Sequence, residues 1–110
     1  MSYIIVLCTT ENQKQAKVIG TQLVREELAA CVNIIPKMNS IYRWEGKIME
    51  DEEAVMLIKT QSSLFEKIKT RIIELHTYDL PEIVALNITN ANKAYLNWID
   101  KETASPTDRA

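Results

Sequence analysis

The strongest constraint on the fold comes from an apolar segment near the start of the chain. Residues 3–10 read Tyr-Ile-Ile-Val-Leu-Cys-Thr-Thr and are β-branched or apolar at both odd and even positions. A strand with one solvent-facing side alternates polar and apolar residues, whereas a strand covered on both faces does not. We therefore predict a central strand here, with neighbouring strands on both sides of it.

Three segments show the apolar spacing of helices. Thr10 followed by Gln13 has the pattern of a capping box before the first of them. Ser63 followed by Glu66 repeats that pattern before the second, which a proline-containing loop then ends. The predicted helices cover residues 12–29, 63–75 and 92–99.

The other apolar segments are predicted strands, and two of them form a long hairpin. The turn of the hairpin is placed at Glu45 and Gly46, and Pro36 must lie at a break or on a sheet edge. The strand segments are 31–35, 41–44, 47–48 continuing through 54–59, and 83–89. The resulting order is β-α-β-β-α-β with a terminal helix, an α+β ferredoxin-like arrangement. Right-handed crossovers predict the strand order 4-1-3-2, with all neighbours antiparallel.

The chain length fits one domain. We assign it to residues 1–101 and predict a disordered polar tail over residues 102–110. The hairpin is longer than two helices can cover, and it carries apolar residues toward its tip, so we expect it to associate with other chains. These apolar residues are Ile41, Tyr42, Trp44, Ile48 and Met49.

Composition excludes several classes of function. Two glycines, Gly20 and Gly46, cannot build the glycine-rich loops that bind nucleotide phosphates. A formal net charge of -2 argues against a nucleic-acid partner. No apolar run is long enough to span a membrane and no signal peptide is evident, so we expect a cytoplasmic protein. A catalytic triad would have to use the sole histidine, His76, and we therefore predict a protein without enzymatic activity.

The predicted topology separates the two cysteines. Cys8 ends the first strand, and the loop that begins at His76 leads into the antiparallel fourth strand, so both belong to one end of the sheet. Cys31 begins the second strand at the opposite end, and a disulfide between the two cysteines is not expected because their Cα atoms would have to lie within ~7 Å.

Five segments, taken together, resemble one known family. They are 29–36 (AACVNIIP), 40–48 (SIYRWEGKI), 57–60 (LIKT), 76–83 (HTYDLPEI) and 95–99 (YLNWI). In this order they are similar to the CutA divalent-cation tolerance family, and the resemblance covers residues 3–99. It implies a homotrimer of ferredoxin-like subunits, similar in architecture to the PII signalling proteins, with the hairpins packed around a threefold axis. It also implies a role in tolerance to copper or other divalent ions.

The resemblance further implies that Cu(II) or another divalent cation binds at Cys8 and His76. A thiolate and an imidazole are donors that copper prefers, but two protein ligands do not complete a site, so Asp79, Glu82 or a neighbouring subunit would have to contribute. The alternative is that Cys8 is a buried core residue and His76 a helix C-terminal residue. The family usually has proline where this chain has Thr77, in the loop that presents the histidine. It commonly has glycine where Ala91 precedes the last helix.

Other candidate residues have simpler interpretations. Cys31 is expected to serve packing, and Tyr42 and Trp44 are expected in a core or an interface. Lys59 and Glu82 lie at strand ends, where they could form a salt bridge between chains or line a small-ligand pocket between subunits. The acidic run 50–53 is interpreted as a solvent-exposed face or as a set of charges that prevents the strand from pairing with another chain. An alternative function is therefore a trimeric signalling or scaffold protein that binds a small ligand or a protein in the clefts between its subunits.

Overall fold

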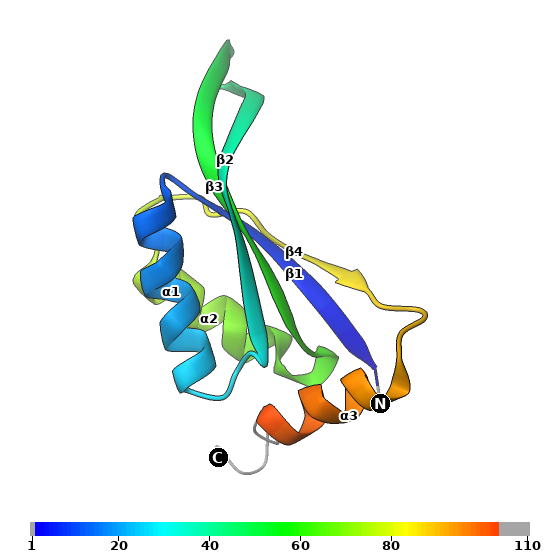
Figure 1. The fold of residues 1–110 in the computed structure, drawn as a ribbon. Coiled ribbons are helices and arrows are strands. Elements are labelled where there is room, and N and C mark those ends of the chain that lie inside the picture. The colour runs from blue at the N-terminus through cyan, green and yellow to red at the C-terminus, as the bar shows by residue number, and fades with distance from the viewer. Residues whose placement is uncertain (1, 104–110) are drawn as a thin grey trace.

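The computed structural model describes residues 2–103 and shows four strands and three α-helices (Figure 1). The elements are β1 (Tyr3–Thr10), α1 (Gln13–Arg25), β2 (Cys31–Trp44), β3 (Lys47–Gln61), a short 3₁₀ helix η1 (Ser62–Leu64), α2 (Phe65–Leu75), β4 (Ile83–Asn87) and α3 (Lys93–Glu102). The predicted tail began at residue 102, but α3 includes Glu102 and Thr103 is buried. The remaining tail residues, 104–110, lie outside the described part.

The strands form one sheet in the order β2-β3-β1-β4, with every neighbouring pair antiparallel, and this confirms the predicted topology. β1 is a central strand, since Val6 pairs with Ile58 of β3 on one side and with Ala85 of β4 on the other. β2 and β4 are the two edge strands.

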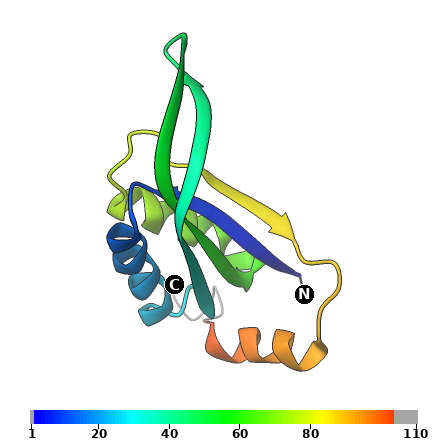
Figure 2. The same ribbon diagram turned by 45° about the horizontal axis from the view of Figure 1, so that its top comes forward.

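α1 and α2 cover one face of the sheet, and α3 lies near the end of the sheet where the chain begins (Figures 1 and 2). The core lies between these two helices and the sheet. On the strands it consists mainly of the even-numbered residues of β1 and β3, which point toward the helices because side chains alternate along a strand. On the helices it includes Ala16, Ile19, Leu23, Ile68 and Ile72, at the spacing of one helical face.

α1 begins and ends at other residues than predicted. Its N-cap is Asn12, whose side chain accepts a hydrogen bond from the Gln15 N–H, so the predicted cap at Thr10 is wrong. Thr10 cannot cap the helix because it is still part of β1, paired with Ala54. The helix stops at Arg25, since Glu27 takes the left-handed conformation with φ of 60°.

α2 also starts later than predicted, and no side chain caps it. The 3₁₀ helix η1 precedes the helix, which starts at Phe65, and the predicted capping box of Ser63 and Glu66 is wrong. The start of α3 is close to the predicted one. The Asn92 side chain caps this helix by accepting a hydrogen bond from the Ala94 N–H.

The hairpin of β2 and β3 extends beyond the rest of the molecule as an arm (Figures 1 and 2). Its two-residue turn is formed by Glu45 and Gly46, both with positive φ, as hairpins with the usual strand twist require. β2 continues through Pro36, which an edge strand tolerates, but the register shifts between Ile35 and Met38. β4 ends at Asn87, two residues earlier than predicted.

The second face of the sheet leaves large apolar side chains exposed. On this face Val84 and Leu86 of β4 pair with Leu7 and Ile5 of β1, and Val84 is 47% and Leu86 52% exposed. The arm, apart from this face, also exposes apolar side chains. Ile41 and Ile48 are 72% and 71% exposed, and they are among the most exposed apolar residues of the described chain. Within residues 2–103, no helix is both long and apolar enough to cross a membrane.

Candidate metal-binding site

Cys8 lies near the end of β1, between Met56 of β3 and Ile83 of β4, and its side chain belongs to the core. It has no exposed surface, and its thiol donates a hydrogen bond to the Thr9 carbonyl at 3.7 Å. Burial, together with the negative charge of Glu82, raises the pKa of Cys8 to about 12. The group is therefore a neutral thiol at neutral pH, whereas a metal binds the thiolate.

His76 follows directly after α2, and its ring is held by two hydrogen bonds. Its Nε2 lies 2.7 Å from the Thr9 carbonyl oxygen, and its Nδ1 lies 3.0 Å from the Tyr78 backbone nitrogen. Since a carbonyl can only accept and a backbone N–H can only donate, Nε2 carries the hydrogen and Nδ1 the lone pair. Both ring nitrogens are thus engaged by the protein. The Tyr78 ring lies 4.7 Å from the imidazole, measured between centroids, and supports this orientation.

The structure therefore brings His76 to the residue that follows Cys8, as the topology predicts. The two donors are of the types that copper binds, but neither is ready to do so, because the thiol is protonated and the imidazole nitrogens are occupied. Among residues 2–103, no three His, Cys, Asp or Glu side chains are grouped so that they could hold a metal ion. Binding by one chain would require rearrangement or further donors.

An open cleft lies beside these residues, between the arm and the loop of residues 78–82. We call it the arm cleft; its volume is about 650 Å³. Tyr42 donates a hydrogen bond to Asp51 across the arm, and Tyr78 donates one to Glu53 at 2.7 Å. Burial and the Glu53 carboxylate raise the pKa of Tyr78 above its ordinary value. Four carboxylates line the cleft: Asp51, Glu53, Asp79 and Glu82.

A polar connection thus links the arm to the end of β1. It runs from Glu53 through the Tyr78 hydroxyl and backbone to His76, and from the imidazole to the Thr9 carbonyl. The sequence predicts His76 as a site residue, but it does not reveal that the Tyr78 backbone N–H donates to its ring or that the Tyr78 hydroxyl donates to Glu53. The sequence does place Tyr78 two residues after the histidine, in a loop that Pro81 ends, and this short spacing is the feature that could have indicated a contact between the two residues.

The remaining candidates lie elsewhere or pack as structural residues. Cys31 is half-buried on the edge strand and pairs with Lys59, at the far end of the sheet from Cys8. The Lys59 ammonium lies 5.7 Å from the Tyr95 ring centroid, which is a cation–π distance, and it lines none of the arm cleft. Trp44 lines the arm cleft.

Comparison with known proteins assigns the chain to a family. The sequence model described as "CutA1 divalent ion tolerance protein" matches residues 4–102. The divalent-cation tolerance protein CutA of Thermus thermophilus is 48% identical over 99 residues, which are 90% of this chain and 96% of that protein. Protein CutA of Homo sapiens is 45% identical over 100 residues, 91% of this chain, but this region is only 56% of the human protein.

Solved structures agree with this assignment. The Thermus thermophilus divalent cation tolerance protein has a TM-score of 0.90 at 46% identity, covering 93% of this chain and 99% of that one. CutA1 of Oryza sativa has a TM-score of 0.93 at 38% identity, covering 96% of each chain. The family match over nearly the whole described chain, the sequence identities and the shared fold lead to one conclusion: the chain belongs to the CutA1 divalent ion tolerance family.

Proposed function

We propose that this chain functions as a homotrimer in divalent-cation tolerance, by binding divalent metal ions, with copper as the first candidate. The family assignment is the observation that carries this proposal. The family name describes tolerance of ions and no reaction, and we infer a role in binding rather than catalysis. A cytoplasmic location remains a prediction; one relative from Arabidopsis thaliana is named chloroplastic, and a structure from Archaeoglobus fulgidus is named periplasmic.

The uncovered apolar surface supports assembly into an oligomer. Val84 and Leu86 on the sheet, and Ile41 and Ile48 on the arm, are each about half exposed or more. Apolar patches of this kind on a small chain mark surfaces that another chain covers. Analytical ultracentrifugation should give three times the chain mass of 12.6 kDa. The double variant Ile41→Glu/Ile48→Glu should dissociate, and a monomeric wild-type protein would contradict the proposal.

The proposed metal ligands are Cys8 and His76, completed by a carboxylate of the arm cleft or by a second subunit. Binding has to remove the thiol proton of Cys8 and displace a hydrogen bond of His76, so each contact is opposed by an interaction that already exists. We therefore expect weak binding that tightens as the pH rises, since the metal has to displace the thiol proton of Cys8.

Calorimetric titration with Cu(II) tests this assignment. Cys8→Ala and His76→Ala should each weaken Cu(II) binding while the trimer persists, and Cys31→Ala is the matched control because it removes the other thiol at the far end of the sheet. Unchanged affinity in both of the first two variants would refute these residues as ligands. Retention of binding in those variants, with loss on Asp79→Asn or Glu82→Gln, would move the metal to the arm cleft.

A second candidate function is a signalling or scaffold trimer that binds a small ligand or a protein. The arm cleft favours it, because it combines a volume of about 650 Å³ with aromatic and carboxylate side chains. A thermal-shift screen of metabolites in the presence of a metal chelator would separate the two functions. Stabilisation by a metabolite without metal supports the second function, and stabilisation only by a divalent cation supports the first.

A further inference from the structure

The loop that follows α2, residues 76–82, begins and ends beside Cys8. At its start the His76 Nε2 lies 2.7 Å from the carbonyl oxygen of Thr9, the residue after Cys8. At its end Ile83 pairs with Cys8 across the sheet and packs against the core that contains the thiol. The loop therefore spans the end of the core at which Cys8 is buried.

Three hydrogen bonds tie the first residues of this loop to three separate elements. The bond from His76 to β1 is the first of them. The Thr77 hydroxyl accepts a second, at 2.8 Å, from the side chain of Gln15 in α1. The Tyr78 hydroxyl donates the third, at 2.7 Å, to Glu53 of β3. We call His76, Thr77 and Tyr78 the clasp. Within it the Tyr78 N–H donates to the imidazole Nδ1, so a displacement of Tyr78 acts directly on His76.

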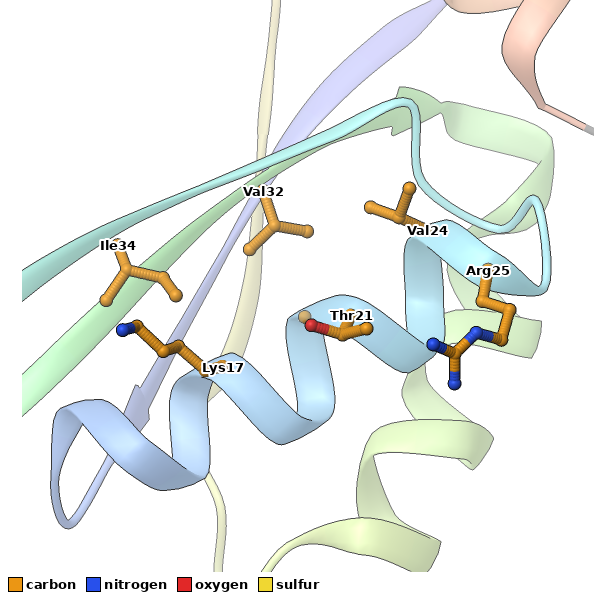
Figure 3. A pocket seen from close by; sticks show the side chains of 7 residues that line it. Lys17, Thr21, Val24, Arg25, Val32 and Ile34 are labelled. Atoms are coloured by element: carbon orange, nitrogen blue, oxygen red, sulfur yellow. The ribbon is translucent and has the colours of Figure 1, made fainter.

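Two of the three anchors belong to the packed body of the molecule. β1 is a central strand with a neighbour on each side. α1 lies close to β2, because a Cβ atom added at Gly20 would lie 3.0 Å from Cγ1 of Val32. Figure 3 shows the side chains of Val32 and Ile34 pointing from β2 toward this helix. The clasp is thus held on one side by elements that close packing keeps in place.

The third anchor lies at the base of the arm. β3 pairs with β1 only as far as Ala54, and Glu53 is the next residue of β3 toward the arm. The register between β2 and β3 shifts at the same level, between Ile35 and Met38, and Met38 pairs with Glu53. Irregularities of this kind bend a pair of strands. The arm therefore leaves the sheet, and has its bend, at the residue that holds Tyr78.

We propose that the clasp is a gate over Cys8 and that the position of the arm controls it. In the described position Tyr78 is bound to Glu53, the gate is closed, and Cys8 has no exposed surface. Bending of the arm at its base breaks this bond, and the clasp then moves away from the end of β1. This movement exposes the thiol and frees the imidazole of His76. The inference rests on the proposed function in one respect, since the open form is the one in which Cys8 and His76 can bind a divalent cation.

A gate predicts that Cys8 reacts through a local opening, which requires less free energy than unfolding of the whole chain. When closing is faster than the reaction, the rate of alkylation is proportional to the population of the open form. Loss of one hydrogen bond of the closed form should raise this population about fivefold.

Alkylation of Cys8 by excess iodoacetamide under native conditions tests the gate without any metal. All proteins carry Cys31→Ala, so that mass spectrometry follows one thiol, and all are compared at one protein concentration. Tyr78→Phe keeps the ring but removes the hydroxyl that binds Glu53, and it should raise the rate of alkylation about fivefold.

Ile99→Val separates opening of the gate from unfolding of the whole chain. Ile99 is fully buried in α3, at the other end of the sheet from Cys8 (Figure 1). Loss of one buried methyl group and loss of one hydrogen bond destabilise a protein to a similar extent, and urea unfolding of both variants measures the match. Ile99→Val should leave the rate of alkylation unchanged, because the clasp is intact.

Glu53→Ala tests the control by the arm. It removes the other partner of the same hydrogen bond and should accelerate alkylation as much as Tyr78→Phe does. The double variant should react no faster than either single variant, because both remove one interaction. Glu52→Ala is the matched control, since it removes an exposed carboxylate of the arm whose side chain points to the opposite face of β3.

Three results would overturn the proposal. The first is a rate in Tyr78→Phe equal to that of the parent protein. The second is equal acceleration by Ile99→Val, which would show that Cys8 reacts through global unfolding. The third is additive acceleration in the Tyr78→Phe/Glu53→Ala double variant.

Calorimetric titration of the same variants with Cu(II) keeps the gate and the proposed ligands apart. If Cys8 and His76 bind the metal, Tyr78→Phe should tighten Cu(II) binding by the same factor as it accelerates alkylation, because the binding-competent form is more populated. Faster alkylation with unchanged Cu(II) affinity would support the gate and refute the two residues as ligands. Tighter Cu(II) binding without faster alkylation would refute the gate.

Discussion

The close approach of α1 to β2 predicts an unusual response to the substitution Gly20→Ala. Alanine in place of glycine inside a helix ordinarily stabilises it by about 0.5–1 kcal/mol. Here the new Cβ would lie 3.0 Å from Cγ1 of Val32 and 3.4 Å from its Cβ, whereas carbon atoms in contact prefer about 3.5–4.0 Å. The valine has to move by about half an ångström, and its β-branched side chain has few alternative rotamers.

Overpacking of this kind costs about 1–3 kcal/mol, which outweighs the gain in helix propensity. We therefore expect Gly20→Ala to lower the free energy of unfolding by about 1 kcal/mol. In a Val32→Ala background Cγ1 is absent and the nearest remaining atom is the Cβ at 3.4 Å. There the same substitution should raise the free energy of unfolding by about 0.5 kcal/mol, a coupling of roughly 1–2 kcal/mol between the two positions.

Urea unfolding followed by circular dichroism measures all four proteins of this cycle. The protein concentration has to be the same throughout, because the stability of an oligomer depends on it. If Gly20→Ala is stabilising by the same amount in both backgrounds, Val32 moves aside without resistance, and the reasoning from close packing is wrong.

Three further predictions concern the thiols and the arm. Iodoacetamide at neutral pH should alkylate half-buried Cys31 and spare Cys8, which is fully buried with its pKa raised to about 12; equal labelling of the two by mass spectrometry would contradict this. Because the folded state holds the Cys8 proton that the unfolded state releases at its ordinary pKa of 9.0, this contribution to stability is complete below pH 9 and declines as the pH rises toward about 12. Cys8→Ala should therefore reduce the alkaline slope of stability against pH in urea titrations, and an unaltered slope would show that another group causes it. Tyr78→Phe removes the hydrogen bond to Glu53 and should destabilise the protein by about 1 kcal/mol and speed hydrogen exchange in the arm. Tyr95→Phe, which removes a hydroxyl without a hydrogen-bond partner in residues 2–103, is its control, and similar exchange in both variants would argue against a role for Tyr78 in holding the arm.

Much of the fold follows from local patterns in the sequence. The apolar run of β1 and the turn at Glu45 and Gly46 are signals that the structure confirms. The strand order then follows from the handedness of crossovers. The start of α1 could not be predicted in the same way, because the cap depends on where β1 ends. Thr10 has the right side chain for a cap, but pairing with Ala54 holds it in the strand.

The candidate site, like the fold, could be predicted from the sequence only in part. Antiparallel topology is sufficient to place Cys8 and His76 at one end of the sheet. It does not reveal that the Thr9 carbonyl and the Tyr78 backbone N–H are hydrogen-bonded to the imidazole. Backbone groups of this kind occur along the whole chain, so no residue type in the sequence indicates which of them will form such bonds. The close approach of α1 to β2 at Gly20 could not be predicted for a related reason, since it depends on how the helix packs on the strand.

The register shift in β2 determines which side chains face the arm cleft. Ile35 pairs with Val55, but Met38 pairs with Glu53, so β2 holds one residue more than β3 between these pairs. Because successive side chains point to opposite faces, that extra residue exchanges the two faces of β2 for the whole arm. It is the reason that Tyr42 and Trp44 lie on the same face as Glu53. Deletion of one residue at the shift would turn both aromatic rings away from the cleft while every residue of its lining remained in the chain.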